Sequence, residues 1–162
     1  MLLCWDGAAW IAAAVSSVNP VGLVGINATA SAPNRLSVSA PASLFNHEGA
    51  GHQLKINKAT AADTASQLFQ AGFSGRAEIG LTGDNDLHLK ASADGTTWRD
   101  GLVIGAATGT PRVPSFTKAA LPGAGSAVAG AVVFVPDESG GAVLAFSDGA
   151  SWRRVTDRAV VS

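Results

Sequence analysis

Four short runs of the sequence place apolar residues at every second position, and this alternation limits most strongly what the chain can fold into. A strand with one buried face has this period. The runs are 36–39, 53–57, 76–81 and 87–91. Clusters rich in Gly, Asp, Asn and Thr accompany them and favour turns at 46–51, 82–86, 93–97 and 107–111. Short strands at this spacing predict a mainly β protein.

One segment, residues 58–67, is the candidate for a helix. It is rich in alanine, but it also holds Thr60, Asp63 and Thr64 and has no continuous apolar stripe.

Small residues dominate the composition. The chain has 19 glycines, no tyrosine, 6 phenylalanines and 4 tryptophans, and much of its 47% hydrophobic content is alanine. Because small side chains bury little area each, a core built by this chain alone would be thin for 162 residues. The net charge is −1, which argues against a nucleic-acid partner, since such proteins need a strong cationic field. The lone Cys4 excludes an internal disulfide.

The apolar stretch 8–18 is about half of the ~20 residues that a membrane-spanning helix needs. No Lys or Arg precedes it, and Asp6-Gly7 interrupts the hydrophobic region that a signal peptide would have. We therefore expect no membrane insertion and no signal peptide.

The motif Asp-Gly-x-x-Trp occurs three times, at 6–10, 94–98 and 148–152. Asp-Gly favours a tight hairpin, because glycine accepts a positive φ and the aspartate accepts hydrogen bonds from the turn. The tryptophan then opens the returning strand. Two interpretations follow: the ring packs against its hairpin partner, or it stays exposed and stacks on the face of a sugar.

Two groups of residues are candidates for a metal site, although we assign no metal. His47 and His52 lie five residues apart around a Gly-rich loop, and a ring of such histidines about a threefold axis would hold an ion. Asp84 and Asp86 offer oxygen ligands for Ca²⁺, but the glycine and the distant glutamate of an EF-hand loop are missing. The alternative for both groups is an ordinary polar turn.

The carboxylates on the predicted loops do not form a recognisable catalytic pair, and the sequence has no GxSxG, Walker A or GxGxxG motif. We expect no enzymatic activity, no catalytic residue and no cofactor. Near the end of the chain, Arg153, Arg154 and Arg158 are suited to clamp the acidic groups of an anionic glycan. The alternative is a solvated charged strand in which Asp157 is the counter-ion.

Two further segments complete the expected organisation. Residues 116–130 are rich in Ala, Gly, Pro and Ser and nearly uncharged, which is typical of a linker. Residues 131–155 alternate apolar runs with turns and predict a three-stranded meander. A unit of that size rarely folds alone in water, so we expect it to dock onto something, for example its own symmetry mates.

Residues 43–58 (SLFNHEGAGHQLKINK) and 63–80 (DTASQLFQAGFSGRAEIG) resemble the distal part of tail-fibre or spike proteins from phages of alphaproteobacteria and from gene transfer agents. Residues 87–90, 101–104, 108–109 and 113 continue the pattern. The ending, 135–157, is similar to the last module of many such fibres, and the opening, 2–10, resembles the close of an upstream fibre domain. Pro111 departs from the pattern, because it stands where the last strand of the family usually runs unbroken.

The resemblance implies an intertwined homotrimeric fibre, elongated and mainly β, on the surface of a virion that is released by lysis. It divides the chain into an N-terminal hairpin (1–18), a central fibre or stalk domain (19–115), the linker (116–130) and a C-terminal meander tip (131–162). The implied partners are copies of the chain itself, other baseplate or fibre proteins, and the polysaccharide of the host surface.

The function that this resemblance implies is host attachment through multivalent, non-catalytic binding of capsule or lipopolysaccharide. The candidate ligand-binding residues form two sets, Trp152 with Arg153 and Arg154, and Trp98 with Asp94 and Arg99. We prefer the first set, because the tip of a fibre usually faces the host. The alternatives are a purely structural stalk or head-spike spacer and a capsule depolymerase.

Overall fold

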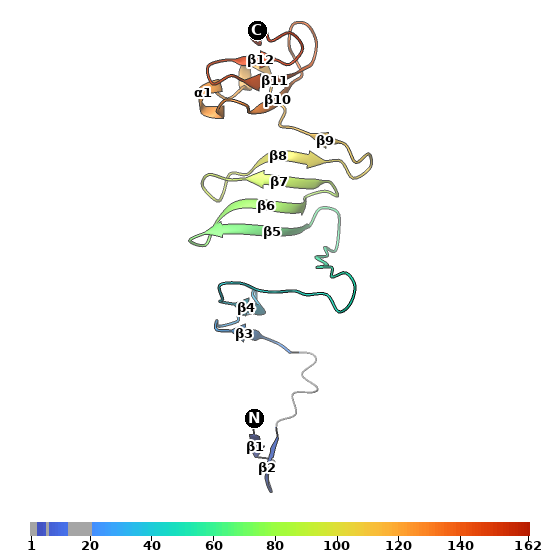
Figure 1. Ribbon diagram of the computed structural model, residues 1–162, viewed down its shortest axis with the longest axis vertical. Coiled ribbons are helices and arrows are strands. Elements are labelled where there is room, and N and C mark those ends of the chain that lie inside the picture. Colours follow the sequence, from blue (N-terminus) through green and yellow to red (C-terminus); the bar gives the residue numbers. More distant parts are fainter. Residues whose placement is uncertain (1–2, 6, 13–20) are drawn as a thin grey trace. The chain divides into compact units, whose positions relative to one another are not determined.

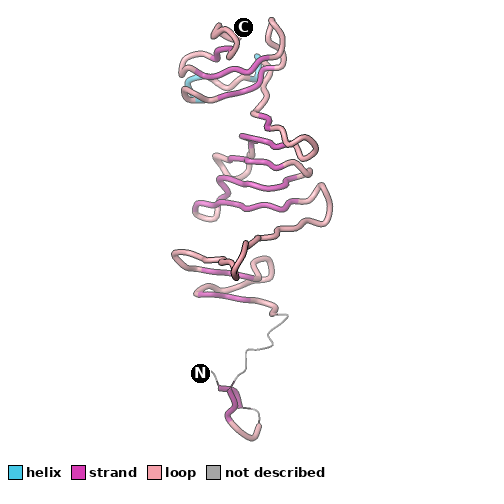
Figure 2. The backbone as a smooth tube through the Cα atoms, turned by 45° about the vertical axis from the view of Figure 1, so that its right-hand side comes forward, coloured by secondary structure: helices cyan, strands magenta, loops and turns pink. Residues whose placement is uncertain are grey.

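The computed structural model describes residues 3–5, 7–12 and 21–162. The chain divides into two compact units, Met1–Leu54 and Lys55–Ser162, which are described separately. The protein is mainly β, with small sheets and short helical turns (Figures 1 and 2). In the described part of the chain, no helix has the length and apolar character needed to cross a membrane.

The first unit begins with an antiparallel hairpin of β1 (Leu3–Trp5) and β2 (Trp10–Ala12). Gly7 has a φ of +104° in its turn, as the Asp-Gly motif predicts. The side chains of these strands, that of Trp10 included, and residues 13–20 lie outside the described part. The next strands, β3 (Val24–Ile26) and β4 (Leu36–Val38), pair in parallel.

Backbone hydrogen bonds hold the described remainder of this unit together. Ser39 N donates to Ile26 O at 2.9 Å, and Val24 N donates to Arg35 O at 2.7 Å. None of residues 21–54 is buried, and Leu44 is 85% exposed. The alternating run 53–57 forms no strand, so that part of the strand prediction is wrong. Two-stranded pairs of this kind are marginal in water without a hydrophobic face to bury.

The second unit opens with a five-stranded antiparallel sheet whose strands lie in chain order. Its strands are β5 (Thr64–Ala71), β6 (Ser74–Thr82), β7 (Leu87–Ala91), β8 (Arg99–Ile104) and β9 (Pro111–Arg112). The alternating runs 76–81 and 87–91 fall inside β6 and β7, which confirms these two predictions.

The helix predicted at 58–67 is wrong. Residues 59–62 form a turn, in which both the backbone N–H and the hydroxyl of Thr60 donate to Asp63 Oδ2 at 2.8 Å. From Thr64 onward the chain pairs with β6. Local side-chain bonds of this type compete with a helix, and cross-strand pairing outweighs the helix propensity of the alanines.

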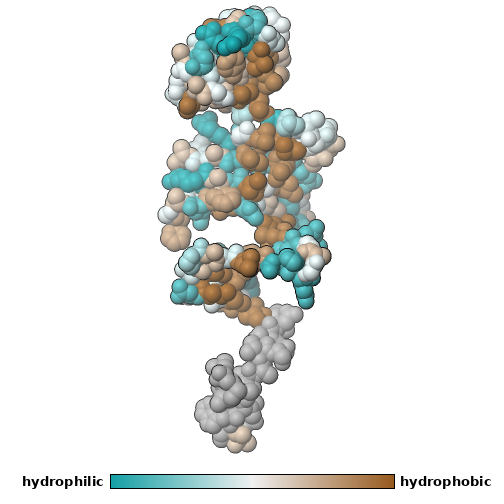
Figure 3. All heavy atoms as spheres, in the orientation of Figure 1, coloured by the Kyte–Doolittle hydropathy of each residue, from teal (hydrophilic) through white to brown (hydrophobic). Residues whose placement is uncertain are grey.

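The register of this sheet separates an apolar face from a polar one. Leu89 lies between Ile79 of β6 and Leu102 of β8, and Leu87 lies between Leu81 and Ile104. Leu87 and Leu89 nevertheless remain 37% and 38% exposed, so the described chain does not bury this face. Figure 3 shows apolar side chains gathered at the surface of the sheet. On the other face, Ser66 Oγ donates to Glu78 Oε1 at 2.6 Å.

The last strand of the sheet accommodates Pro111. Gly105 N donates to Thr110 O at 3.0 Å, and Ile104 is opposite Pro111. Because hydrogen-bonded and non-hydrogen-bonded pairs alternate along an antiparallel ladder, Ile104 and Pro111 occupy a non-hydrogen-bonded position. The nitrogen of Pro111 therefore faces away from β8, where its missing hydrogen costs the sheet nothing.

The C-terminal part of this unit is the predicted meander, an antiparallel sheet of β10 (Val132–Val135), β11 (Val143–Ser147) and β12 (Trp152–Arg154). It has a hydrophobic core of its own. The buried members are Ala124, Val133, Val135, Val143, Ala145 and Trp152.

The segment 116–130 is not the linker that its composition suggests. It forms a 3₁₀ turn (Lys118–Ala120) and the short helix α1 (Ala124–Ala127), and Phe116 and Leu121 pack against the buried residues of the meander. Phe134 N also donates to Pro114 O at 2.9 Å. The core of the meander is therefore completed by residues that precede it in the chain.

Candidate functional site

The structure places the preferred C-terminal set of residues in a structural role. Trp152 is 6% exposed, within the core of the meander, and its Nε1 donates to Pro122 O at 2.7 Å. Its ring offers no free face for a sugar, so its assignment as a stacking platform is wrong. The packing interpretation of this tryptophan is correct.

The neighbouring arginines are paired within the chain. Arg153 forms an ion pair with Asp148, and Arg154 Nη2 lies 2.7 Å from Asp157 Oδ2. Arg154 Nη1 also lies 3.3 Å from the buried carboxylate of Glu138. These carboxylates already occupy the groups that an anionic glycan would need, and Asp157 is the counter-ion that the alternative interpretation names.

The second set of residues lies on the turn between β7 and β8. Asp94 Oδ1 accepts hydrogen bonds from Thr96 N at 2.8 Å and Thr97 N at 2.7 Å, while Gly95 N donates to Ser92 Oγ at 2.9 Å. Hydrogen bonds from the Thr97 and Thr96 amides lower the pKa of Asp94 strongly. The aspartate is thus a fixed anion that organises the turn.

Trp98 follows this turn and is half-buried. Its ring lies against Gly75 of β6, since a Cβ atom built on Gly75 would come within 2.8 Å of Trp98 Cζ2. Gly95, with a φ of +82°, brings the turn equally close, because a Cβ there would lie 2.4 Å from Ser74 Oγ. Glycine at 75 and 95 therefore allows the turn and its tryptophan to rest on the start of β6.

A groove of about 460 Å³ opens beside this contact. Leu68 and Trp98 supply apolar surface to it, and Glu78 and Asp94 supply carboxylates. A second depression of about 470 Å³ borders the same turn and includes Asp94 and Arg99. Asp94 therefore lines both depressions, whereas Trp98 lines only the first and Arg99, the first residue of β8, only the second.

Phe73, which no sequence motif singles out, also lines the groove. It stands at the tip of the β5–β6 hairpin, is 97% exposed and has a φ of +64°. Gly72 before it signals a tight turn, but neither the exposure nor the left-handed backbone of a phenylalanine is visible in the sequence.

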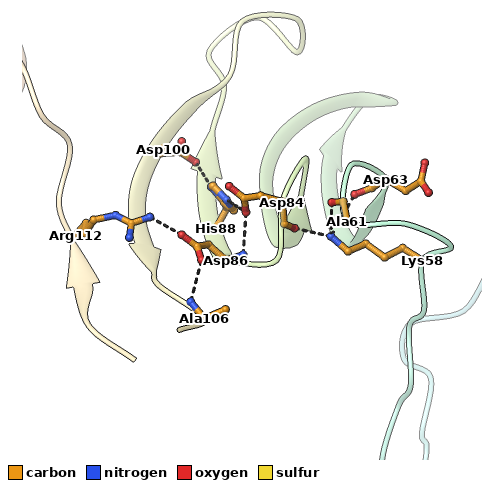
Figure 4. A network of polar contacts seen from close by, with 9 residues as sticks. All are labelled: Lys58, Ala61, Asp63, Asp84, Asp86, His88, Asp100, Ala106 and Arg112. Atoms are coloured by element: carbon orange, nitrogen blue, oxygen red, sulfur yellow. Dashed lines mark hydrogen bonds and ion pairs between the residues drawn. The ribbon is translucent and has the colours of Figure 1, made fainter. Parts of the chain in front are cut away.

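The other end of the sheet carries a polar network centred on His88 (Figure 4). His88 Nδ1 lies 2.9 Å from Asp100 Oδ1, and Nε2 lies 2.9 Å from Asp84 Oδ1. Carboxylates only accept hydrogen bonds, so both contacts are hydrogen bonds at once only in the charged imidazolium form, in which both ring nitrogens carry a proton. Burial alone would lower the pKa of His88, but the two carboxylates outweigh it and raise the pKa.

Asp86 and Lys58 extend this network to the ends of the neighbouring strands. Asp86 accepts from Ala106 N at 2.8 Å and pairs with Arg112, so its pKa is lowered by the amide first and the arginine second. Lys58 Nζ donates to the carbonyls of Ala61 and Asp84. The network joins the entry to β5, the β6–β7 turn and the β8–β9 loop.

The candidate metal ligands are engaged in other contacts. Asp84 and Asp86 hold the network of Figure 4. His47 Nδ1 accepts from Gly49 N at 3.1 Å, and the ring of His52 stacks on Phe45 with centroids 6.1 Å apart. Within the described residues, no group of three or more His, Cys, Asp or Glu side chains is arranged to hold a metal ion.

Comparison of the chain with protein-family profiles, with curated proteins and with solved structures finds no match.

Proposed function

We propose that this chain is a segment of a phage-type tail fibre or spike that assembles from three copies and attaches a particle to glycans of a host cell surface. Binding would be non-catalytic, and the groove beside Trp98 would be its site. The observation that carries this proposal is the half-buried indole of Trp98, held against Gly75 on a turn with polar groups on both sides. Binding sites for small ligands combine such apolar surfaces with a few fixed polar groups.

The apolar face of the five-stranded sheet supports the assembly. Ile79, Leu81, Leu87, Leu89 and Leu102 share this face, and its central leucines keep more than a third of their surface exposed. Residues 21–54 add further exposed apolar side chains without a buried residue among them. Copies that cover these surfaces for one another would gain apolar burial that a single chain lacks.

Three copies would also explain how a shallow site is useful. A groove of this size gives few contacts per chain, but linked sites raise the effective concentration and increase avidity by about 10²–10⁴. A particle with several such fibres adds to this effect. In this proposal the other virion proteins hold the fibre, and the host polysaccharide is its ligand.

Light scattering after size exclusion tests the assembly. We expect a mass near three times 16.2 kDa. Leu89→Lys, which places a charge on the apolar face, should reduce the mass to that of one chain, whereas Lys90→Ala on the opposite face should not. A folded parent chain that is monomeric would overturn the trimer.

Binding to immobilised polysaccharides from bacterial surfaces tests the recognition. The parent chain should bind at least one of them, and Trp98→Ala should reduce binding by about tenfold or more without loss of assembly. Arg153→Ala, whose partner is Asp148, should bind as the parent does. If the assembled parent binds none of the polysaccharides, the chain is a structural spacer.

A further inference from the structure

Phe73 combines two unfavourable features, an exposed aromatic ring and a left-handed backbone. Its ring is 97% exposed, so folding gains no apolar burial from it. Its φ of +64° lies in the left-handed region, which bulky residues rarely adopt and which Asn or Gly would occupy at lower cost. Strained residues of this kind are concentrated at functional sites, where function rather than stability retains them.

The strained residue Phe73 is also one of the residues that line the groove. Phe73 comes from the β5–β6 hairpin and Trp98 from the turn before β8, yet both line the same groove. Leu68 of β5, which is opposite Glu78 of β6, lines the groove as well. The groove therefore has aromatic surface from two separate elements, and the left-handed turn at Gly72 and Phe73 presents one of them.

The charges in the groove restrict what it can bind. Glu78 and Asp94 both line it, and the pKa of Asp94 is held low by the Thr97 and Thr96 amides. No lysine or arginine is among the described residues that line it. Carboxylates accept hydrogen bonds from hydroxyl groups, but they repel a second carboxylate or a sulfate.

We propose that Phe73 is a ligand-contacting residue that gives the groove a second aromatic surface beside Trp98, and that the groove takes an uncharged, hydroxyl-rich sugar. This inference rests on the proposed glycan recognition and gives its ligand class. The hydroxyls of the sugar donate to Glu78 and Asp94, and its C–H face lies on the aromatic rings. Acidic polysaccharides are excluded by the same two carboxylates.

The substitution Phe73→Asn gives a sharp test, because function and stability should change in opposite directions. Asparagine suits the left-handed backbone, so the melting temperature should rise by about 2–4 °C. The lost ring should weaken binding by about tenfold or more. A residue kept for packing would show a loss of stability instead.

Val128 supplies a matched control outside the groove. It is 68% exposed and also strained, with a φ of 66° and a ψ of 151°. Val128→Gly should likewise raise the melting temperature, but it should leave binding unchanged. The probes are immobilised neutral polysaccharides (dextran, mannan and galactan) and acidic ones (alginate and polygalacturonate).

The outcomes separate this inference from the proposed function. Binding of the parent to a neutral polysaccharide, lost in Phe73→Asn and kept in Val128→Gly, supports the inference. Undiminished binding by Phe73→Asn, a lower melting temperature or a changed solution mass overturns the role of Phe73, and binding to the acidic polysaccharides overturns the ligand class. A parent that binds neither group contradicts the proposed recognition itself.

Discussion

The turns at 94–98 and 148–152 have the same Asp-Gly-x-x-Trp motif, yet their tryptophans differ in environment. In both turns the aspartate Oδ1 accepts hydrogen bonds from the second and third amides that follow it, at 2.7–2.9 Å. Trp98 borders a groove on the five-stranded sheet, whereas Trp152 is buried in the core of the meander. The motif specifies the turn, and the surroundings decide what the ring does.

The surroundings differ in what they offer to the indole ring. At Trp98 the neighbour is Gly75, a residue without a side chain in a sheet that has no second layer in the described chain. At Trp152 the segment before the meander supplies Ala124 and a carbonyl of Pro122. The ring of Trp98 therefore keeps exposed surface that another molecule can contact, whereas the ring of Trp152 is buried within the fold.

Replacing each of the two tryptophans by alanine should show the difference between them most clearly. Trp152→Ala removes the largest side chain of the meander core and should cost about 3–5 kcal/mol of unfolding free energy. Trp98→Ala removes a half-buried ring and should cost about 1–2 kcal/mol. Urea denaturation followed by far-UV circular dichroism measures both values, and equal losses would contradict the different roles.

Gly75→Ala tests whether the close approach of backbone and indole positions Trp98. The new methyl group would lie 2.8 Å from Trp98 Cζ2, so the ring must move, at a cost of about 1–3 kcal/mol. In a background where Trp5, Trp10 and Trp152 are replaced by Phe, so that Trp98 is the remaining tryptophan, its fluorescence should shift, and polysaccharide binding should fall. Gly101→Ala is the control, because its Cβ would meet only Leu89 O at an ordinary 3.6 Å.

Lowering the pH should distinguish Asp94 from Asp148, the aspartates of the two turns. The ion pair with Arg153, and then the amides of Ala150 and Ser151, lower the pKa of Asp148 to about 2, and the pKa of Asp94 is also strongly lowered. Since both folded pKa values lie below the unfolded value of about 3.9, their stabilisation is complete above that pH and is lost as pH falls through the folded values.

Chemical shifts of the Ser151 and Thr97 amides, followed from about pH 5 downward, measure these transitions. Ser151 should report a midpoint near pH 2. Asp148→Asn should abolish that transition and leave the one at Thr97 unchanged. A Ser151 midpoint near the unfolded value of about 3.9 would contradict the hydrogen-bonded turn.

The smallest predicted effect is a loss of stability at alkaline pH, and this loss should be confined to the five-stranded sheet. The pKa of His88 is raised, so its stabilisation is complete below the unfolded value of about 6.5 and is lost as pH rises through the folded value. Above the folded pKa, the His88 ring loses one proton, and one of its hydrogen bonds to Asp84 and Asp100 is lost. The melting temperature should fall by about 2 °C.

Hydrogen exchange locates this loss. Amides of β7 and β8 should exchange faster at alkaline pH than the intrinsic rate predicts, while those of β11 should follow the intrinsic rate. His88→Gln should remove the difference. Equal loosening of both regions would show that His88 does not join Asp84 to Asp100 as described.

The sequence predicted what depends on local pattern. The period-2 runs identified β6 and β7, and the Asp-Gly motif identified the turns, because these features arise from backbone preference and from neighbours in the chain. The candidate residues Asp94, Trp98 and Arg99 come from the same motif, and their role in binding stays a prediction. The errors lie where distant contacts decide the outcome.

Three errors illustrate this limit. Residues 58–67 have alanines that favour a helix, but pairing with β6 makes part of them a strand. Residues 116–130 have the composition of a linker, but Phe116, Leu121 and Ala124 of this segment complete the core beside Val133 and Trp152. Trp152 and Trp98 cannot be told apart by their motifs, since Gly75 and Pro122 lie far from them in sequence.

The proline of β9 has a consequence for growth of the sheet. At the outer edge of β9, the position of Pro111 has no hydrogen to offer to an incoming strand, whereas no strand or proline protects the outer edge of β5 (Thr64–Ala71) in the described chain. Within the described chain, the edge at β9 is therefore less suited to pair with a further strand than the edge at β5.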